Sequence, residues 1–380
     1  MSSLNPTLPQ PARNRRMDIL RAITIVLVVI GHTGSIPGAS WWEIHFPLCT
    51  YRLAIFLFAS GYFFKDIDWR TYPSFVWRKT KALAFPLLGW NIVYACVATI
   101  FVWKNAVDYL PPIQRIWTFH ALFAEPFWSG HQYIFNLATW FVGMLFVGLV
   151  VYGLIHITTR QCKYIDHLLL VFYFGIAVLG LYAARFPLGH EWLLPLHVSY
   201  ALFFIHFGKY YRRYLEPFIE RVPTWLLLPI ILLFQYTVVH FTGIKLFALV
   251  WMNFEGLIVA PIGLAIAGIL LWMRLCRIIE QNVLPNKLEK WVSESTWDIM
   301  THHIFVKVMV AWLLIHFAIE PQLLPAYRQS IWFLPSTMDY WTLILLEVGL
   351  PVAFHYAFGW CKKRFSLFLN KKDNALGTSV

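Results

Sequence analysis

The sequence predicts an all-α polytopic membrane protein with about ten transmembrane helices and both termini in the cytoplasm. Hydrophobic residues make up 59% of the 380 residues and charged residues only 13%, which excludes an ordinary soluble globular protein. Apolar runs long enough to cross a hydrocarbon core of about 30 Å recur along the whole chain. Most of the 31 lysines and arginines also fall on one side of these runs, as cytoplasmic connections require.

The apolar runs define the predicted spans in chain order. Continuous runs of this length suit helices, whereas barrel strands would show alternating segments of about ten residues. The predicted spans are 16–36, 48–64, 83–103, 134–157, 166–184, 192–208, 223–242, 249–273, 297–318 and 340–360. Because an even number of spans returns the chain to its starting side, both termini are expected on the cytoplasmic face.

The distribution of basic residues sets the orientation of the chain. With a cytoplasmic N-terminus, the basic residues outside the inner connections are Lys104, Arg115, Arg185, Lys245 and Arg328 in outer connections and Arg52 and Lys307 within spans. The net charge of +12 therefore reflects orientation and the anionic inner leaflet. We expect membrane lipids as partners and no nucleic acid.

The domain organisation is simple. Residues 1–12 contain proline and serine and are expected to form a mobile tail, residues 13–361 a single transmembrane domain, and residues 362–380 a short basic cytoplasmic tail. A cleaved signal peptide over 13–39 is the alternative, which the arginine inside its apolar core disfavours. The five cysteines are scattered and lack metal-binding spacing, so no metal site is expected.

Arg21 and His32 are the most informative pair, because both lie in the first strongly apolar segment, MDILRAITIVLVVIGHTG. Eleven helical steps bring the two side chains to within about 20° of one azimuth and separate them by about 16 Å along the axis. Ionisable residues in a span are costly and usually mark a functional site. The alternative is that Arg21 extends to one membrane surface and His32 lies at the other.

Other polar residues in apolar context are secondary candidates. Arg52 in the second predicted span needs a carboxylate or a ligand, and Glu255 in the eighth is a conceivable partner. His302 and His303 are neighbours that point about 100° apart, so at most one of them shares a given helix face. Packing is the expected role of His302.

Several fragments form an ordered set of motifs. The opening RRMDILRAITIVLVVIGH contains Asp18, Arg21 and His32, and FLFASGYFFK contains Ser60, Gly61 and Tyr62. The later fragments are FVWRKTKALAFPLLGW with Arg78, Lys79 and Lys81, TWFVGMLF with Trp140, YALFFIHFGKYYRR, and STWDIMTHHIF with His303.

Together these fragments resemble the membrane-bound acyltransferase-3 family, and within it the fucose 4-O-acetylase-like sugar O-acetyltransferases. Met300 and Thr301 stand where the family usually has Tyr-Leu, so a contact made by that tyrosine is not expected here. The resemblance implies transfer of an acetyl group from acetyl-CoA to a hydroxyl of a polysaccharide or lipid-linked glycan, in a bacterial inner membrane. Acetyl-CoA is then a donor substrate, and no permanently bound cofactor is expected.

The site residues expected on this basis fall into three groups: catalytic His32, Arg21 and Asp18; donor-binding Arg78, Lys79, Lys81 and Arg52; and substrate-binding His303, Trp140 and Tyr62. An imidazole can take the proton of a sugar hydroxyl, and a guanidinium can hold a phosphate or polarise the thioester. There is an alternative explanation for each charge. The preference for basic residues on the cytoplasmic side also explains Arg78, Lys79 and Lys81, and a favourable interaction with the helix dipole at an N-terminus also explains Asp18.

The sequence is compatible with two mechanisms. Either the acceptor hydroxyl attacks the thioester directly, or His32 is acylated first and passes the acyl group to the hydroxyl. A transporter or flippase for a glycan intermediate is the rival function, and a sensory or scaffolding protein without turnover is a third.

Overall fold

The computed structural model describes residues 14–34, 36–47, 50–108, 110–128, 133–160, 164–244, 247–330 and 338–376. The tail predicted over residues 1–12 and the last four residues of the predicted basic tail lie outside this range. Ten long helices or helix runs form the main body: α1 (Arg15–Thr33), α3 (Arg52–Tyr62), α4 (Tyr72–Lys79) running into α5 (Phe85–Trp103), α8 (Trp140–Thr159), α9 (Ile165–Ala183), α10 (Leu193–Tyr210), α12 (Thr224–Thr242), α13 (Ala260–Asn282), α15 (Thr296–His316) and α17 (Tyr340–Leu376).

Short elements connect these helices. A π-helical turn, Thr80–Ala84, joins α4 to α5, and a 3-10 turn, Ile134–Thr139, leads into α8. The short helices are α2 (Ser40–His45), α6 (Ile113–Ile116), α7 (Glu125–Trp128), α11 (Glu216–Ile219), α14 (Lys287–Glu294) and α16 (Leu324–Gln329). The strands β1 (Phe247–Ala248) and β2 (Asn253–Phe254) pair antiparallel, with Phe247 opposite Phe254.

Every predicted span overlaps a helix, so the all-α polytopic class is confirmed. In the described part of the chain, seven helices are long and apolar enough to cross a membrane, and α3 is apolar but has only 11 residues. Because α1, α3 and α10 fall outside those seven, the count of about ten spans and the cytoplasmic location of the termini stay predictions.

Two predicted boundaries differ from the structure. The eighth span was expected to begin at residue 249, but α13 begins at Ala260, after β2 and a left-handed Gly256. Pro261 suits the first helical turn, where its missing N–H costs nothing. At the C-terminus, α17 continues through the predicted basic tail to Leu376, because neither glycine nor proline interrupts residues 361–376.

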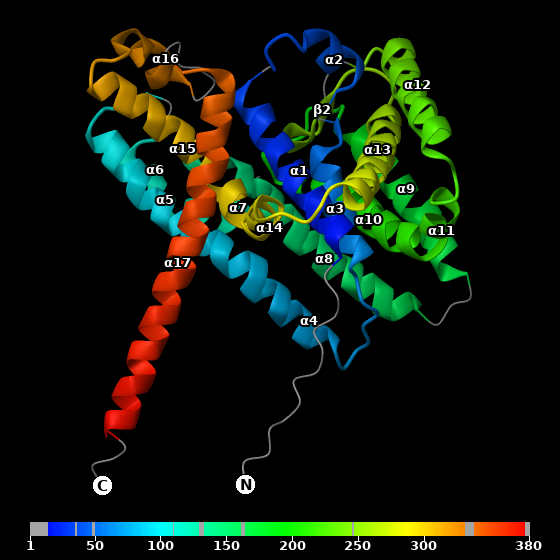
Figure 1. Cartoon of the computed structure of the whole chain (residues 1–380), viewed down its shortest axis with the longest axis horizontal. Coiled ribbons are helices and arrows are strands. Elements are labelled where there is room, and N and C mark those ends of the chain that lie inside the picture. The colour runs from blue at the N-terminus through cyan, green and yellow to red at the C-terminus, as the bar shows by residue number, and fades with distance from the viewer. Residues whose placement is uncertain are drawn as a thin grey trace.

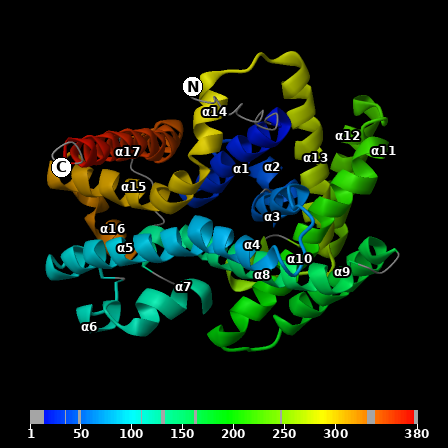
Figure 2. The ribbon, with the colours of Figure 1, turned by 90° about the horizontal axis from the view of Figure 1, so that it is seen from below.

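α1 lies at the centre of the bundle. It packs against α3, α13, α14, α15 and α17, and α10 packs against α3, α8 and α9. Figure 2 shows α1 and α3 side by side, with α15 and α17 on one side of them and α13 on the other. The C-terminal half of α17 extends away from the other helices (Figure 1). This arrangement lets several helices contact one α1 surface.

Two glycines of the sequence motifs bring α3 and α10 into backbone contact. A Cβ atom added to Gly61 would lie 1.7 Å from the carbonyl oxygen of Ile205, and one added to Gly208 would lie 2.0 Å from that of Phe58. Small residues at such positions allow membrane helices to approach closely. The motif around Gly61 and the motif around Gly208 therefore form one helix crossing.

We predict that Gly61→Ala and Gly208→Ala each destabilise the protein by about 1–3 kcal/mol, because rigid backbone atoms cannot move away from the added methyl group. The measurement is the thermal unfolding midpoint of purified protein in detergent. Gly175→Ala in α9 is the matched control, since no atom lies within 4 Å of its added Cβ, and its midpoint should not fall. Equal unfolding midpoints for all three variants would contradict a close backbone contact between α3 and α10 at Gly61 and Gly208.

Candidate active site

Two histidines from distant parts of the chain meet at one end of α1. His32 lies in the last turn of α1 and His303 in α15, and the Nδ1 atom of His32 is 3.1 Å from the Nε2 atom of His303. The ring centroids are 5.0 Å apart. His303 is buried, whereas His32 is partly exposed. His32 is thus the member of the pair that a substrate can reach.

The hydrogen-bond partners assign the tautomers of this pair. Nδ1 of His303 lies 2.8 Å from the carbonyl oxygen of Ile299, which only accepts, so this nitrogen carries the proton. Nε2 of neutral His303 then accepts, and Nδ1 of His32 donates to it. The lone pair of neutral His32 therefore lies on Nε2, the atom that points away from its partner. A proton taken up by His32 would therefore go to Nε2.

Lys307, Tyr340 and Glu347, which we call the α1 end cluster, hold the C-terminal turn of α1. The Lys307 ammonium donates to the carbonyl oxygens of His32 at 3.0 Å and Thr33 at 3.4 Å. The last carbonyls of a helix lack intrahelical partners and carry partial negative charge, so a buried cation here stabilises the helix end. Lys307 is 2% exposed and interacts electrostatically with Glu347.

α17 supplies the other two members of the cluster. Oε2 of the fully buried Glu347 lies 2.7 Å from the Thr33 hydroxyl, which also approaches the Val29 carbonyl oxygen at 2.9 Å. The Tyr340 hydroxyl donates to the carbonyl oxygens of Ile30 and Gly34 at 3.3 and 3.1 Å. The backbone on both sides of His32 is therefore tied to α15 and α17.

Arg52 lies against α1 beside His32. A Cβ atom on Gly31 would lie 1.1 Å from the Nη1 atom of Arg52, so the guanidinium occupies the space that this glycine leaves. The same nitrogen donates to the carbonyl oxygen of Leu27 at 3.4 Å. Arg52 at the start of α3 meets the last turns of α1, and Phe63 after the end of α3 meets Arg21, so the two helices run antiparallel.

Arg52, which the sequence groups with the donor-binding cations, lies at the His32 end of α1, about 15 Å along the helix from Arg21. Its donor-binding role stays a prediction. Glu255 was considered as its partner within the eighth span, but Glu255 is exposed in the segment between β2 and α13. The apolar content of residues 249–259 predicts the start of a helix, but the structure has a 3-10 turn and the strand β2 in this segment.

Arg21 lies at the opposite end of α1. Its Nη1 atom is 3.8 Å from Oδ1 of Asp18, and its guanidinium lies 5.3 Å from the ring centroid of Phe63. The Arg21 side chain is 41% exposed, whereas Asp18 is buried. Lys79 of α4 lies within electrostatic range of both Arg21 and Arg78. Arg21 and the basic end of α4 therefore form one cationic region.

The remaining predicted residues are distributed over several places. Arg78 and Lys81 are exposed, and the Lys81 ammonium lies 5.4 Å from the ring centroid of Trp77. The Tyr62 hydroxyl donates to Glu216, and the Arg212 guanidinium lies 5.2 Å from the Tyr62 ring, so Tyr62 belongs to the Arg21 end. The buried ring of Trp140 lies 4.8 Å from that of His197. Of the three predicted substrate contacts, the structure brings only His303 into contact with His32.

The N-terminal end of α1 is held by ion pairs. Arg15 pairs with Glu289 of α14 at 3.0 Å, and Arg16 pairs with Glu280 at 3.0 Å and Glu216 at 3.2 Å, and also with Glu220. Burial raises the pKa of the Glu216 carboxyl, although the Tyr62 hydrogen bond and the Arg16 charge oppose this rise. Arg15 and Arg16 thus do more than set the orientation of the chain.

Comparison with known families decides the class of this site. A family model described as an acyltransferase domain matches residues 14–293, which is most of the chain and includes Arg21, His32 and the basic end of α4. The chain belongs to the acyltransferase-3 family. Comparisons with curated proteins and with solved structures gave no match.

The protein is therefore a multi-pass membrane acyltransferase. The matched segment ends before α15, so His303 and Lys307 reach the site from beyond it. Within the described ranges, no group of three or more histidine, cysteine or acidic side chains is arranged to hold a metal ion.

Sequence reasoning missed the α1 end cluster, although two of its members carry a signal. Lys307 and Glu347 are ionisable residues inside predicted spans, and such residues usually have a partner or a function. Because Lys307 and Glu347 are 40 residues apart in the sequence, their interaction could not be predicted from it. Tyr340 and Thr33 carry no comparable signal, because their roles depend on which helices pack together.

We predict that Lys307→Met lowers the free energy of unfolding of this acyltransferase by about 3 kcal/mol, because it leaves a buried carboxyl and the α1 carbonyls without their cation. Adding Glu347→Gln removes the uncompensated acid and should recover part of the loss. Unfolding midpoints of the single and double variants in detergent measure both effects.

The exposed Lys290 of α14 supplies the matched control, and Lys290→Met should leave the midpoint unchanged. If the double variant lost the sum of the two single losses, Lys307 and Glu347 would act independently, contrary to this account.

Proposed function

We propose that this acyltransferase moves an acetyl group from acetyl-CoA to a hydroxyl of a polysaccharide or lipid-linked glycan in a bacterial inner membrane, as the fucose 4-O-acetylase-like branch does. The observation that carries the proposal is the His32–His303 pair, in which His303 accepts from Nδ1–H of a partly exposed imidazole, so that the basic lone pair of neutral His32 lies on Nε2. The cationic region around Arg21, at the other end of the same helix, supports a separate place for the anionic donor.

The reaction follows from these positions. Nε2 of His32 takes the proton of the sugar hydroxyl as its oxygen forms a bond to the thioester carbonyl carbon. The carbon–sulfur bond breaks, and the CoA thiolate receives the proton from His32. His303 orients the imidazole and accepts from its Nδ1–H, a hydrogen bond that strengthens while His32 is charged. Return of the proton from His32 to the leaving thiolate restores the neutral imidazole for the next turnover.

The donor is assigned to the Arg21 end. Arg21 and Lys79, together with the exposed Arg78 and Lys81, offer a set of cations for the phosphates of CoA, and Asp18 restrains the Arg21 guanidinium. The pantetheine arm then carries the thioester along α1 toward His32. Acetyl-CoA is a substrate in this scheme and is released as CoA after each turnover.

A relay through acetylated His32 is the second form of the same function. In that form Nε2 attacks the thioester itself, and the glycan hydroxyl later takes the acetyl group from the imidazole. The lone pair on Nε2 suits both forms, because each begins with that atom. Ping-pong kinetics would identify the relay, and a ternary complex would identify direct transfer.

We predict that His32→Ala lowers acetyl transfer at least about 100-fold, because the base is lost. Membranes containing the full-length protein are given acetyl-labelled acetyl-CoA with the native glycan, and label in the glycan is counted. His120→Ala is the matched control, since His120 is exposed in the segment before α7, and it should keep full activity. Equal labelling by wild type and His32→Ala would remove the base assignment.

Arg21→Lys tests the donor side separately. A lysine keeps the charge but loses the paired contacts of a guanidinium, so KM for acetyl-CoA should rise about tenfold while KM for the glycan stays constant. Arg70→Lys, at an exposed position before α4, serves as the control. An unchanged donor KM for Arg21→Lys would assign the donor to another place.

A further inference from the structure

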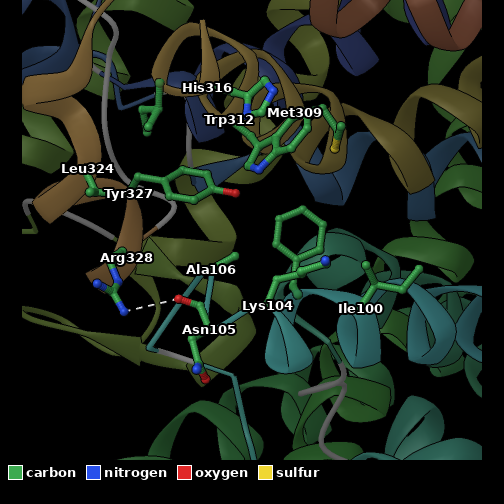
Figure 3. Close-up of a pocket in the computed structure, with 12 residues that line it drawn as sticks. Ile100, Lys104, Asn105, Ala106, Met309, Trp312, His316, Leu324, Tyr327 and Arg328 are labelled. Atoms are coloured by element: carbon green, nitrogen blue, oxygen red, sulfur yellow. Dashed lines mark hydrogen bonds between the residues drawn. The ribbon is translucent and has the colours of Figure 1, made fainter. Parts of the chain in front are cut away.

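A cavity of about 620 Å³ lies between the C-terminal end of α5, the C-terminal half of α15 and α16 (Figure 3). Its wall is mainly apolar, with Ile100, Phe101, Met309 and Ile315 among the lining residues. The Trp312 ring stacks on His316, with centroids 5.0 Å apart and planes 10° apart. The cavity is therefore shaped chiefly by hydrocarbon and aromatic surface.

Two cations, Lys104 and Arg328, stand among these apolar residues. They are two of the few basic residues in connections that the charge pattern assigns to the outer side. The orientation rule explains basic residues on the inner side, but it offers no reason for two of the outer ones to line a single cavity. This coincidence indicates a ligand with negative charge.

Arg328 keeps donor capacity for such a ligand. Its Nη2 atom donates to the carbonyl oxygen of Asn105 at 3.1 Å, as Figure 3 shows, and lies 3.5 Å from Oδ1 of Asp108. Its Nε atom is buried and has no hydrogen-bond partner among the described residues. A buried N–H group without an acceptor is costly, and an anionic oxygen would remove that cost.

We propose that this cavity binds a membrane lipid that carries an anionic phosphate. The phosphate lies between Lys104 and Arg328, and the hydrocarbon chain lies along Ile100, Met309 and Trp312. A soluble glycan fits less well, because its hydroxyls would lose their hydration against these apolar side chains. The lipid gains by apolar burial and by charge-assisted hydrogen bonds at the same time.

The cavity is separate from the His32 site. Trp312 follows His303 by nine residues on α15, which places the two on opposite faces of the helix. We therefore expect a variant without the catalytic base to bind the lipid still.

The experiment uses full-length protein in vesicles of phosphatidylcholine that contain a small fraction of phosphatidic acid with a photoreactive acyl chain. After irradiation, crosslinked peptides are quantified by mass spectrometry. We expect labelling of the peptides that contain Met309–His316 and Leu324–Arg328. The double variant Lys104→Gln, Arg328→Gln should lower this labelling about tenfold, because two charge-assisted contacts are lost.

Arg115→Gln is the matched control, because it removes an exposed outer cation that does not line the cavity, and it should label like wild type. His32→Ala should also label like wild type. Equal labelling by photoreactive phosphatidylcholine, or by the double variant, would show an apolar surface covered by bulk lipid and would overturn the proposal. Competition by inorganic phosphate or by soluble glycan would assign the cavity to those ligands instead and would equally overturn it.

Discussion

The structure depends on the way both ends of one central helix are held. At its C-terminal end, Lys307 binds the carbonyls of His32 and Thr33, and Tyr340 and Glu347 contact the neighbouring turn. The last carbonyls of a helix have no intrahelical partner, and a buried carbonyl without a hydrogen bond is costly. A buried lysine therefore stabilises the helix end and fixes the backbone that carries the imidazole.

The N-terminal end of α1 is fixed by different physics. Arg15 and Arg16 pair with carboxylates from α13, α14 and the segment after α10, where the side chains are partly exposed. Ion pairs in partly exposed positions contribute little individually, but a network that joins several helices restrains their relative positions. α1 is thus held by a buried polar cluster at one end and by an ionic network at the other, which fixes the helix that carries Arg21 and His32 relative to its neighbours.

Small residues determine how closely other helices approach this arrangement. Gly61 and Gly208 let α3 and α10 touch through their backbones, and Gly31 makes room for the Arg52 guanidinium beside His32. The contact between α3 and α10 packs two helices together, whereas the contact at Gly31 places the Arg52 cation beside His32. A methyl group at either place would meet an atom at less than van der Waals distance, although Arg52 can move aside more readily than a backbone carbonyl.

The sequence by itself determined which segments are helices and which family the chain resembles, because apolar length and local motifs need no partner to be recognised. It also identified Arg21 and His32, whose relation lies within one helix and follows from its geometry alone. Only the tertiary structure decided that His303 meets His32 across 271 residues, that Lys307 caps α1 and that Arg52 belongs to the His32 end. These contacts depend on which helix faces are packed together, and an apolar membrane segment carries little local information about its neighbours.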